Sequence, residues 1–196
     1  MKLILASASP RRAEILRNAG IPFETQITLL DESILPGELP GDYVRRLALE
    51  KARAAASARK RTDECILIGA DTAVVADDEL LAKPESEEDA RRMLRLLSAS
   101  THEVHTGLAV LRQPDRIERV VEEITRVSFA PLSDDEIDAY IATGEPFDKA
   151  GGYGIQGIAG RYVTRIEGCY FNVMGLPLAR LWSLLRGFGW EDSTRV

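Results

Sequence analysis

The feature that most constrains the fold is a short apolar run that ends in a glycine and leads directly to a carboxylate. Residues 65–68 read Cys-Ile-Leu-Ile, which is typical of a strand buried on both faces. Gly69 follows, and we expect the backbone to turn there. The turn would leave Asp71 at the exit of a buried strand, a common place for a functional side chain.

The residues after Asp71 predict a hairpin. A second strand over residues 72–76, a polar Asp-Asp-Glu turn and a return strand over residues 80–82 complete the pattern. The hairpin would bring Asp71, Thr72 and Lys83 together at one end of a sheet. An aspartate that only starts a turn fits the same spacing, so other parts of the chain must decide between the two interpretations.

The N-terminal segment has the pattern of a phosphate-binding loop. Residues 3–6 predict a buried strand, Ser9 is a typical N-cap, and Pro10 suits the first position of a helix. The free N–H groups at such a helix start attract anions, and Arg11 and Arg12 add positive charge. A well-capped helix with two solvated arginines is the alternative.

A lysine lies on the apolar face of the next predicted helix. Asp42 is expected to cap this helix, and Val44 and Leu47 begin its apolar stripe. Lys51 continues the stripe and therefore needs an anionic partner, unless its long side chain reaches the surface. Glu32, in the preceding loop, is a candidate carboxylate, although acidic surface loops are common.

Further elements follow from caps and periodicity. In chain order they are a strand at 21–24, a helix capped by Ser86, strands at 104–111 and 117–129, a helix capped by Ser133, a hairpin of 162–166 with 169–173, and a closing helix that includes Leu178, Leu181, Trp182, Leu185 and Phe188.

Residues 145–157 form a loop that is too rich in glycine to pack by its side chains. Glycine permits close backbone approach to a ligand, and the polar groups presented there are Asp148, Lys149 and Gln156. A flexible surface loop is the alternative.

Composition excludes several classes of protein. The 196 residues suit one domain, which we place at residues 1–189, with a tail at 190–196. A net charge of −6 argues against broad nucleic-acid binding. No apolar run approaches the length of a membrane span and the N-terminus does not resemble a signal peptide, so we expect a cytoplasmic protein.

The cysteines and histidines do not predict a zinc site. Cys65 and Cys169 are far apart and are expected to be free thiols. His102 and His105 would point to opposite faces of their strand. Any metal should therefore be bound by oxygen ligands.

Five motifs in order resemble the Maf family of nucleoside-triphosphate pyrophosphatases over nearly the whole chain. They lie at residues 5–12, 43–52, 69–72 with 83–84, 148–157 and 172–177. The chain departs from the usual family pattern at Ala73, Gly152 and Met174, and none of these changes removes a functional group.

The resemblance implies an α/β fold, with a mixed, strongly twisted central sheet flanked by helices and two lobes around a deep cleft. It also implies hydrolysis of a nucleoside triphosphate between the α and β phosphates, with Mg²⁺ or Mn²⁺, by a homodimer. Arg12, Thr72 and Gln156 match the subtype that prefers dTTP and UTP, with CTP and modified pyrimidine triphosphates as further candidates. The family is associated with nucleotide-pool sanitation and with arrest of cell division.

The resemblance also suggests roles for individual residues. Asp71 would activate water as the base, with Glu32, Lys51 and Lys83 as further catalytic groups. Glu32 and Asp71 would bind the metal, and the division between base and ligand stays open. Substrate would be bound by Ser7, Ser9, Arg11, Arg12, Thr72, Asp148, Lys149 and Gln156.

Three other functions fit parts of the sequence. A pyrophosphatase for damaged purine triphosphates would share the same site, and a nucleotide-sensing regulator of septum formation would bind nucleotides with little turnover. A nucleic-acid-binding module is disfavoured by the acidic balance and by the lack of interleaved basic and aromatic residues.

Overall fold

The computed structural model describes residues 1–191 of the chain. The residues cluster into two compact units. Unit 1 contains Met1–Asp71, Thr106–Glu123 and Gly175–Val196, the last of these described as far as residue 191. Unit 2 contains Thr72–His105 and Ile124–Met174. The single domain expected over residues 1–189 stays a prediction.

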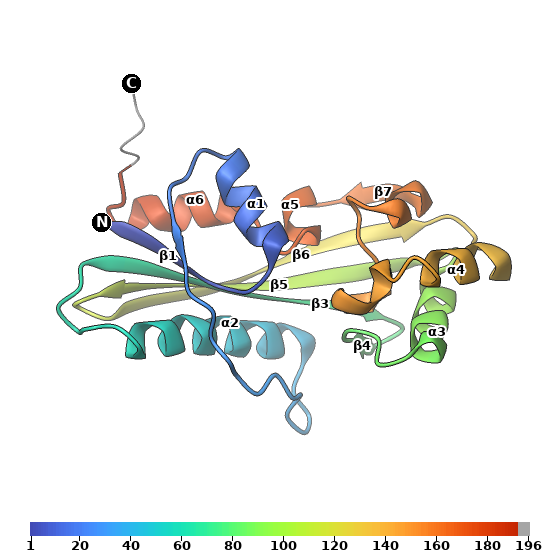
Figure 1. Ribbon diagram of the computed structural model, residues 1–196, viewed down its shortest axis with the longest axis horizontal. Coiled ribbons are helices and arrows are strands. Elements are labelled where there is room, and N and C mark those ends of the chain that lie inside the picture. The colour runs from blue at the N-terminus through green and yellow to red at the C-terminus, as the bar shows by residue number, and fades with distance from the viewer. Residues whose placement is uncertain (192–196) are drawn as a thin grey trace. The chain divides into compact units, whose positions relative to one another are not determined.

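Seven strands within residues 1–191 form one mixed sheet (Figure 1). They are β1 (Lys2–Ala6), β2 (Glu24–Thr25), β3 (Cys65–Ala76), β4 (Glu79–Leu81), β5 (Thr101–Gln113), β6 (Ile117–Phe129) and β7 (Val163–Glu167). Neighbours follow the order β2-β1-β3-β5-β6-β7, with β4 paired to β3. β1 is parallel to β2 and β3, whereas β4 and β7 run antiparallel to their partners. The predicted mixed α/β class is confirmed.

In unit 1 the sheet has helices on both faces, with α2 on one and α1 and α6 on the other (Figure 1). These helices are α1 (Pro10–Asn18), α2 (Pro40–Ser57) and α6 (Leu178–Gly187). The inner face of α2 is rich in alanine, and Ala48, Ala52 and Ala55 pack with Ile4 and Leu67 in one buried cluster. Small side chains at these positions allow the helix to lie close to the strands.

Two glycines on the sheet set the distance to α2. A Cβ atom at Gly69 would lie 2.0 Å from the carbonyl oxygen of Ala48, and one at Gly107 would lie 2.0 Å from that of Val44. The turn predicted at Gly69 is therefore wrong, because β3 runs straight through this residue. Asp71 lies within the strand and not at its exit.

Unit 2 is built around an aromatic core. Its helices are α3 (Glu87–Leu97), α4 (Asp134–Ile141) and α5 (Tyr170–Val173), with 3₁₀ turns η1 (Glu145–Asp148), η2 (Ala150–Gly152) and η3 (Ile158–Tyr162). The rings of Phe129 and Tyr153 meet edge to face with centroids 4.8 Å apart. The Ser86 and Ser133 caps are confirmed, since each hydroxyl accepts a hydrogen bond from a first-turn N–H group.

The polar turn predicted between β3 and β4 is confirmed. Ala76 pairs with Glu79, so Asp77 and Asp78 form a two-residue loop. Both residues have positive φ angles, 48° and 62°. This pattern is that of a type I′ turn, whose twist matches the flanking strands.

Other predicted elements differ from the structure. Of the segment at 169–173, residues 170–173 form helix α5 and not a strand. This helical turn places the buried Asn172 so that its amide donates to Val104 O and Thr125 Oγ1. β7 pairs with β6 instead. The strand expected at 21–24 is limited to β2.

Two boundaries also moved. Helix α2 starts at Pro40, which suits the first helical position, and Asp42 lies in the first turn instead of at the cap. Trp190, which was expected to begin the tail, is instead buried, and its ring packs edge to face against Trp182. Residues 192–196 of that tail lie outside the described residues.

Candidate active site

A lysine and an aspartate are buried together in unit 1. Side chains alternate along a strand, so Asp71 points to the same side of β3 as Gly69, the side covered by α2. There the Lys51 ammonium on α2 donates to Asp71 Oδ1 at 2.6 Å. Lys51 is 8% exposed and Asp71 7%. The expected anionic partner is confirmed, and the alternative of a lysine reaching the surface is wrong.

Glu32 supplies a second carboxylate to the same lysine. Its Oε1 lies 2.6 Å from Lys51 Nζ, and its side chain is 45% exposed. One ammonium thus lies between a buried and a half-exposed carboxylate, which leaves the trio with a net charge of −1. Such a group can hold a cationic or proton-donating ligand on its open side.

Tyr43 was not singled out from the sequence, yet it borders this trio. Its hydroxyl donates to the backbone oxygen of Glu32 at 3.0 Å. Burial, with the charges of Asp71 and Glu32 adding to it, raises the pKa of Tyr43 to about 12, so the phenol stays protonated and remains a donor. Spacing could have revealed it, because Tyr43, Leu47 and Lys51 share one helix face.

The N-terminal loop of unit 1 is organised by a buried arginine. Arg12 is 9% exposed; its Nε donates to Gly175 O at 2.7 Å and its Nη1 to Ser7 Oγ at 3.1 Å. Burial lowers the pKa of Arg12, and the nearby Asp71 charge opposes this shift. The alternative of two solvated arginines is therefore wrong for Arg12, while Arg11 is half-buried.

The start of α1 has the expected form. Ser9 is the N-cap and Pro10 the first helical residue, but the Ser9 side chain makes no capping hydrogen bond. Its backbone N–H donates to Ser7 Oγ at 3.1 Å. A helix start of this kind, beside a buried arginine, has the polarity that an anionic group requires.

The other five candidates belong to unit 2, and most of their side chains reach solvent. Lys83, Asp148 and Gln156 are exposed, whereas Thr72 and Lys149 are half-buried. Lys149 Nζ contacts Asp148 Oδ1 at 2.5 Å and donates to Glu145 O at 2.7 Å. These contacts hold the loop together.

The glycine-rich loop itself is packed, against expectation. Gly151, Gly152 and Tyr153 are buried, and Gly151 donates its N–H to Ala82 O at 3.0 Å. Gly151 has φ of 67°, and a Cβ atom there would also meet the Val74 side chain at 2.9 Å. Glycine is needed here for close contact with the β3–β4 hairpin.

Within residues 1–191, no three His, Cys, Asp or Glu side chains gather as a metal-binding group. Glu32 and Asp71 nevertheless converge on one cation, the Lys51 ammonium. Carboxylate oxygens are the ligands that Mg²⁺ and Mn²⁺ prefer, and Mg²⁺ often uses one or two of them together with substrate phosphates. The residues present therefore fit a divalent cation.

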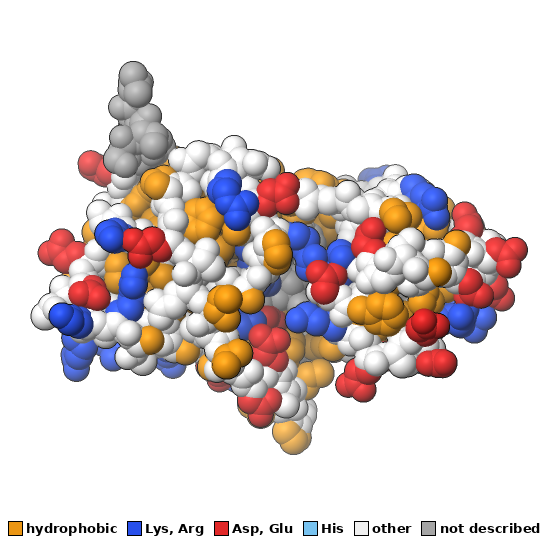
Figure 2. All heavy atoms as spheres, viewed as in Figure 1, with side chains coloured by type: hydrophobic (Ala, Val, Ile, Leu, Met, Phe, Trp, Pro, Cys, Tyr) orange, Lys and Arg blue, Asp and Glu red, His pale blue; other side chains and the backbone are white. Residues whose placement is uncertain are grey.

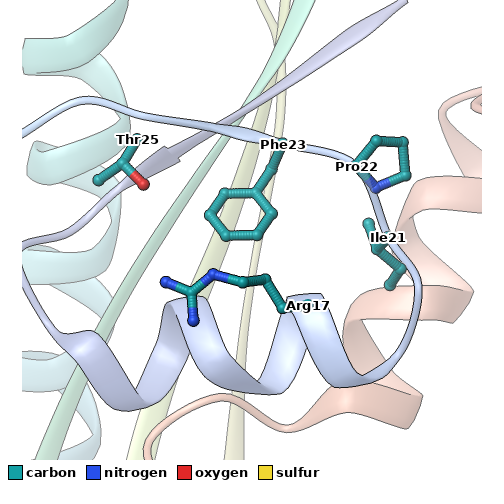
Figure 3. A pocket seen from close by; sticks show the side chains of 5 residues that line it. All are labelled: Arg17, Ile21, Pro22, Phe23 and Thr25. Atoms are coloured by element: carbon teal, nitrogen blue, oxygen red, sulfur yellow. The ribbon is translucent and has the colours of Figure 1, made fainter.

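A separate shallow pocket of about 350 Å³ lies between the end of α1 and the segment that leads to β2 (Figure 3). It is lined by Arg17, Ile21, Pro22, Phe23 and Thr25. None of these residues belongs to the candidate site.

The visible face of the structure carries charges of both signs, and acidic and basic side chains are interspersed on it (Figure 2). No helix within residues 1–191 has both the length and the apolar character needed to cross a membrane. Cys65 and Cys169 are free thiols, as expected.

Comparisons with known proteins agree on one family. A family model described as Maf-like protein matches residues 2–188. A dTTP/UTP pyrophosphatase of Koribacter versatilis is 53% identical over 189 residues, which cover 96% of this chain and 95% of the relative. A dTTP/UTP pyrophosphatase of Moorella thermoacetica is 50% identical over 195 residues, covering 100% of this chain and 99% of the relative.

A solved structure, the Ham1 protein of Staphylococcus aureus, resembles the chain with a TM-score of 0.54. The match covers 96% of this chain and 100% of that structure at 13% identity. At this level of identity the likeness concerns the fold alone.

Proposed function

The chain belongs to the Maf family, and we propose that it is a nucleoside-triphosphate pyrophosphatase that hydrolyses dTTP and UTP to the monophosphate and pyrophosphate. The observation that carries this proposal is the buried Lys51 ammonium between Asp71 and Glu32. Relatives named dTTP/UTP pyrophosphatase, about half identical over nearly the full chain, support the choice of substrate.

In this proposal the carboxylate of Asp71 accepts a proton from the water that attacks the α phosphorus. Its contact with Lys51 keeps the group fixed in a site with little solvent. Negative charge develops on the oxygen that leaves with pyrophosphate, and fixed cations stabilise it. We assign this role to Lys51 and Lys83.

The substrate's phosphates would be bound at the N-terminal loop. Arg12 holds the loop through Ser7 and Gly175, and α1 begins beside it, with Ser9 as its N-cap and Pro10 as its first residue. Ser7, Ser9 and Arg11 complete the proposed phosphate-binding group. The anion preference of a helix N-terminus supports this assignment.

We propose Glu32 and Asp71 as ligands for Mg²⁺ or Mn²⁺. When bound, the metal would supply positive charge that neutralises the phosphates and orients them. Glu32 is half-exposed and can reach such an ion, while Lys51 keeps the two carboxylates close together. Activity that persists in full after chelation would contradict this assignment.

We assign base recognition to Gln156 and Thr72 in unit 2 and to Arg12 in unit 1. A glutamine amide offers both a donor and an acceptor, which matches the edge of uracil or thymine. Asp148 and Lys149 would help to bind substrate from the same loop as Gln156. We also propose a cytoplasmic homodimer that acts on free nucleotides and not on nucleic acid, with a role in nucleotide-pool sanitation and in arrest of cell division.

Pyrophosphate release from a panel of triphosphates tests the proposal. We expect turnover of dTTP and UTP with Mg²⁺ or Mn²⁺, weaker activity on CTP and little on purines. Asp71→Asn should lower the rate by about 10²- to 10⁴-fold while the fold is kept. Preference for modified purines would indicate the alternative substrate class, and binding without turnover would indicate a nucleotide-sensing regulator.

A further inference from the structure

The loop that carries Glu32 lacks regular secondary structure over residues 26–39, between β2 and α2. Most of its large apolar side chains are exposed, with Leu29 at 95%, Leu39 at 66% and Leu35 at 50%. Hydrophobic burial therefore contributes little to the position of this loop, and segments of this kind open easily. Polar contacts must hold Glu32 in place.

Arg46 on α2 makes the most extensive of these contacts. Its Nε and Nη2 donate to the two carboxylate oxygens of Glu38 at 2.6 and 2.8 Å, and Nη2 also donates to Ser33 O at 3.0 Å. The Glu38 side chain is 7% exposed and that of Arg46 21%. Bidentate pairs with little solvent are the strong form of this interaction.

The contacts of Arg46 reach the residue next to Glu32. Ser33 is held through its backbone oxygen, and Tyr43, beneath the Arg46 guanidinium at 5.7 Å, donates to Glu32 O. Glu38 in turn accepts from the N–H of Leu35 at 3.0 Å. One guanidinium thus fixes the backbone on the C-terminal side of Glu32.

We propose that Arg46 is a positioning residue, which holds the Glu32 carboxylate at Lys51 by fixing the loop through Glu38 and Ser33. The inference rests on the proposed function, in which Glu32 contributes to catalysis. The hydrogen bonds that Arg46 donates to Glu38 raise the pKa of Arg46, in agreement with a persistent ion pair.

Arg53 provides a matched control on the same helix. It makes a bidentate pair with Glu118, with Nε–Oε1 at 3.0 Å and Nη2–Oε2 at 2.7 Å, and this pair does not involve the Glu32 loop. If Arg46 merely stabilises α2, Arg46→Ala and Arg53→Ala should behave alike.

The test compares both alanine variants in the wild-type and Glu32→Gln backgrounds, by kcat and KM for pyrophosphate release from dTTP. We expect Arg46→Ala to lower kcat roughly 10- to 100-fold, because a misplacement of about 1 Å has such effects. Arg53→Ala should stay within about twofold, as expected for a surface pair. In the Glu32→Gln background, Arg46→Ala should have no further effect.

Equal effects of the two alanine variants would overturn the inference. The inference would also be overturned if Arg46→Ala lowered kcat as much in the Glu32→Gln background as in the wild-type background. A charge swap, Arg46→Glu with Glu38→Arg, should restore part of the activity lost in Arg46→Glu.

Hydrogen exchange over residues 26–39 separates this inference from the proposed function. We expect faster exchange in Arg46→Ala than in Arg53→Ala or the wild type, whether or not dTTP is a substrate. Unchanged exchange would refute the positioning role. An inactive wild-type protein with faster exchange in Arg46→Ala would instead refute the proposed function alone.

Discussion

Burying an ammonium group costs free energy unless anions replace its water, and Lys51 meets this requirement with two carboxylates. The sequence indicated that Lys51 needed an anion, because the lysine falls on an apolar helix face. Glu32 and Asp71 were candidate carboxylates, but the sequence could not show that both contact Lys51, since the three residues come from separate segments of the chain. The contacts of Tyr43 and Arg46 with the Glu32 loop were missed for the same reason.

Lys51→Met should destabilise the protein by about 3–5 kcal/mol, because Asp71 would remain as a buried carboxylate without its main partner. Denaturant unfolding measures this change. Lys2→Met is the control, since Lys2 and Glu24 form an exposed pair at 2.8 Å whose loss should have much less effect. If both variants lost the same free energy of unfolding, burial of the Lys51–Asp71 pair would not explain the effect.

Gln156→Ala should reduce discrimination between bases while leaving the chemistry intact. Gln156 is exposed, so its removal should not affect folding. We expect the ratio of kcat/KM for dTTP to that for dGTP to fall on the order of tenfold, the value of one or two hydrogen bonds. Asp71→Asn, by contrast, should slow all nucleotides alike. An equal loss on every nucleotide in Gln156→Ala would argue against base recognition.

His102 should make the stability of the protein depend on pH. Burial lowers its pKa to about 4, and its Nε2 is paired with the Tyr153 hydroxyl at 2.8 Å. The unfolded chain binds the proton more readily than the folded protein does. The contribution of neutral His102 to the free energy of unfolding is therefore fully present above about pH 6.5 and is lost as pH falls through about 4. The loss amounts to about 3 kcal/mol.

The measurement compares the free energy of unfolding of the wild type with that of His102→Phe between pH 4 and 7. Phenylalanine keeps the edge contacts with Phe129 and Tyr153 but does not titrate. The difference between the two proteins should change across this range. A constant difference would show that His102 does not titrate with a lowered pKa.

At the scale of elements, caps and periodicity predicted most helices and strands, because these signals are local. Ser86, Ser133 and the run at residues 117–129 are examples. The errors came from contacts between elements. Gly69 looked like a turn but accommodates α2, and residues 170–173 looked like a strand but fold around the buried Asn172.

Gly69→Ala should therefore affect both stability and activity. The added Cβ would meet backbone atoms of Ala48 and Ala52 at 2.0 and 2.9 Å, so α2 must move away from β3. We expect a loss of about 1–3 kcal/mol in thermal or denaturant unfolding. Lys51 moves with the helix, so the rate should fall as well.

Gly187→Ala is the matched control for this change. Gly187 lies at the end of α6, and a Cβ atom there would meet nothing within 4 Å. This variant should be neutral or slightly more stable, because alanine favours helix. If Gly69→Ala were equally harmless, the close approach of α2 would not be needed.

At the scale of the whole molecule, the two units share strands: β3, β5 and β6 each contain residues of both. Backbone hydrogen bonding along these strands should couple their unfolding. The family resemblance implied the α/β class and two lobes, but the sequence did not indicate which residues belong to each unit, because each unit combines segments that are distant in the chain.

Unfolding should therefore follow one transition. Both tryptophans, Trp182 and Trp190, belong to unit 1, so their fluorescence reports on that unit, whereas far-UV circular dichroism reports on both. We expect the two signals to give the same midpoint in urea. Separate midpoints would show that the units unfold independently.

The glycines beneath α2 bear on how this enzyme can be engineered. At Gly69 and Gly107 the side chain is a single hydrogen atom, and any larger group would strike the helix backbone. Libraries that randomise the neighbourhood of Lys51 should leave both codons untouched. Surface positions such as Arg53 can instead be varied. Changes there do not alter the distance between α2 and the sheet, and therefore do not move Lys51.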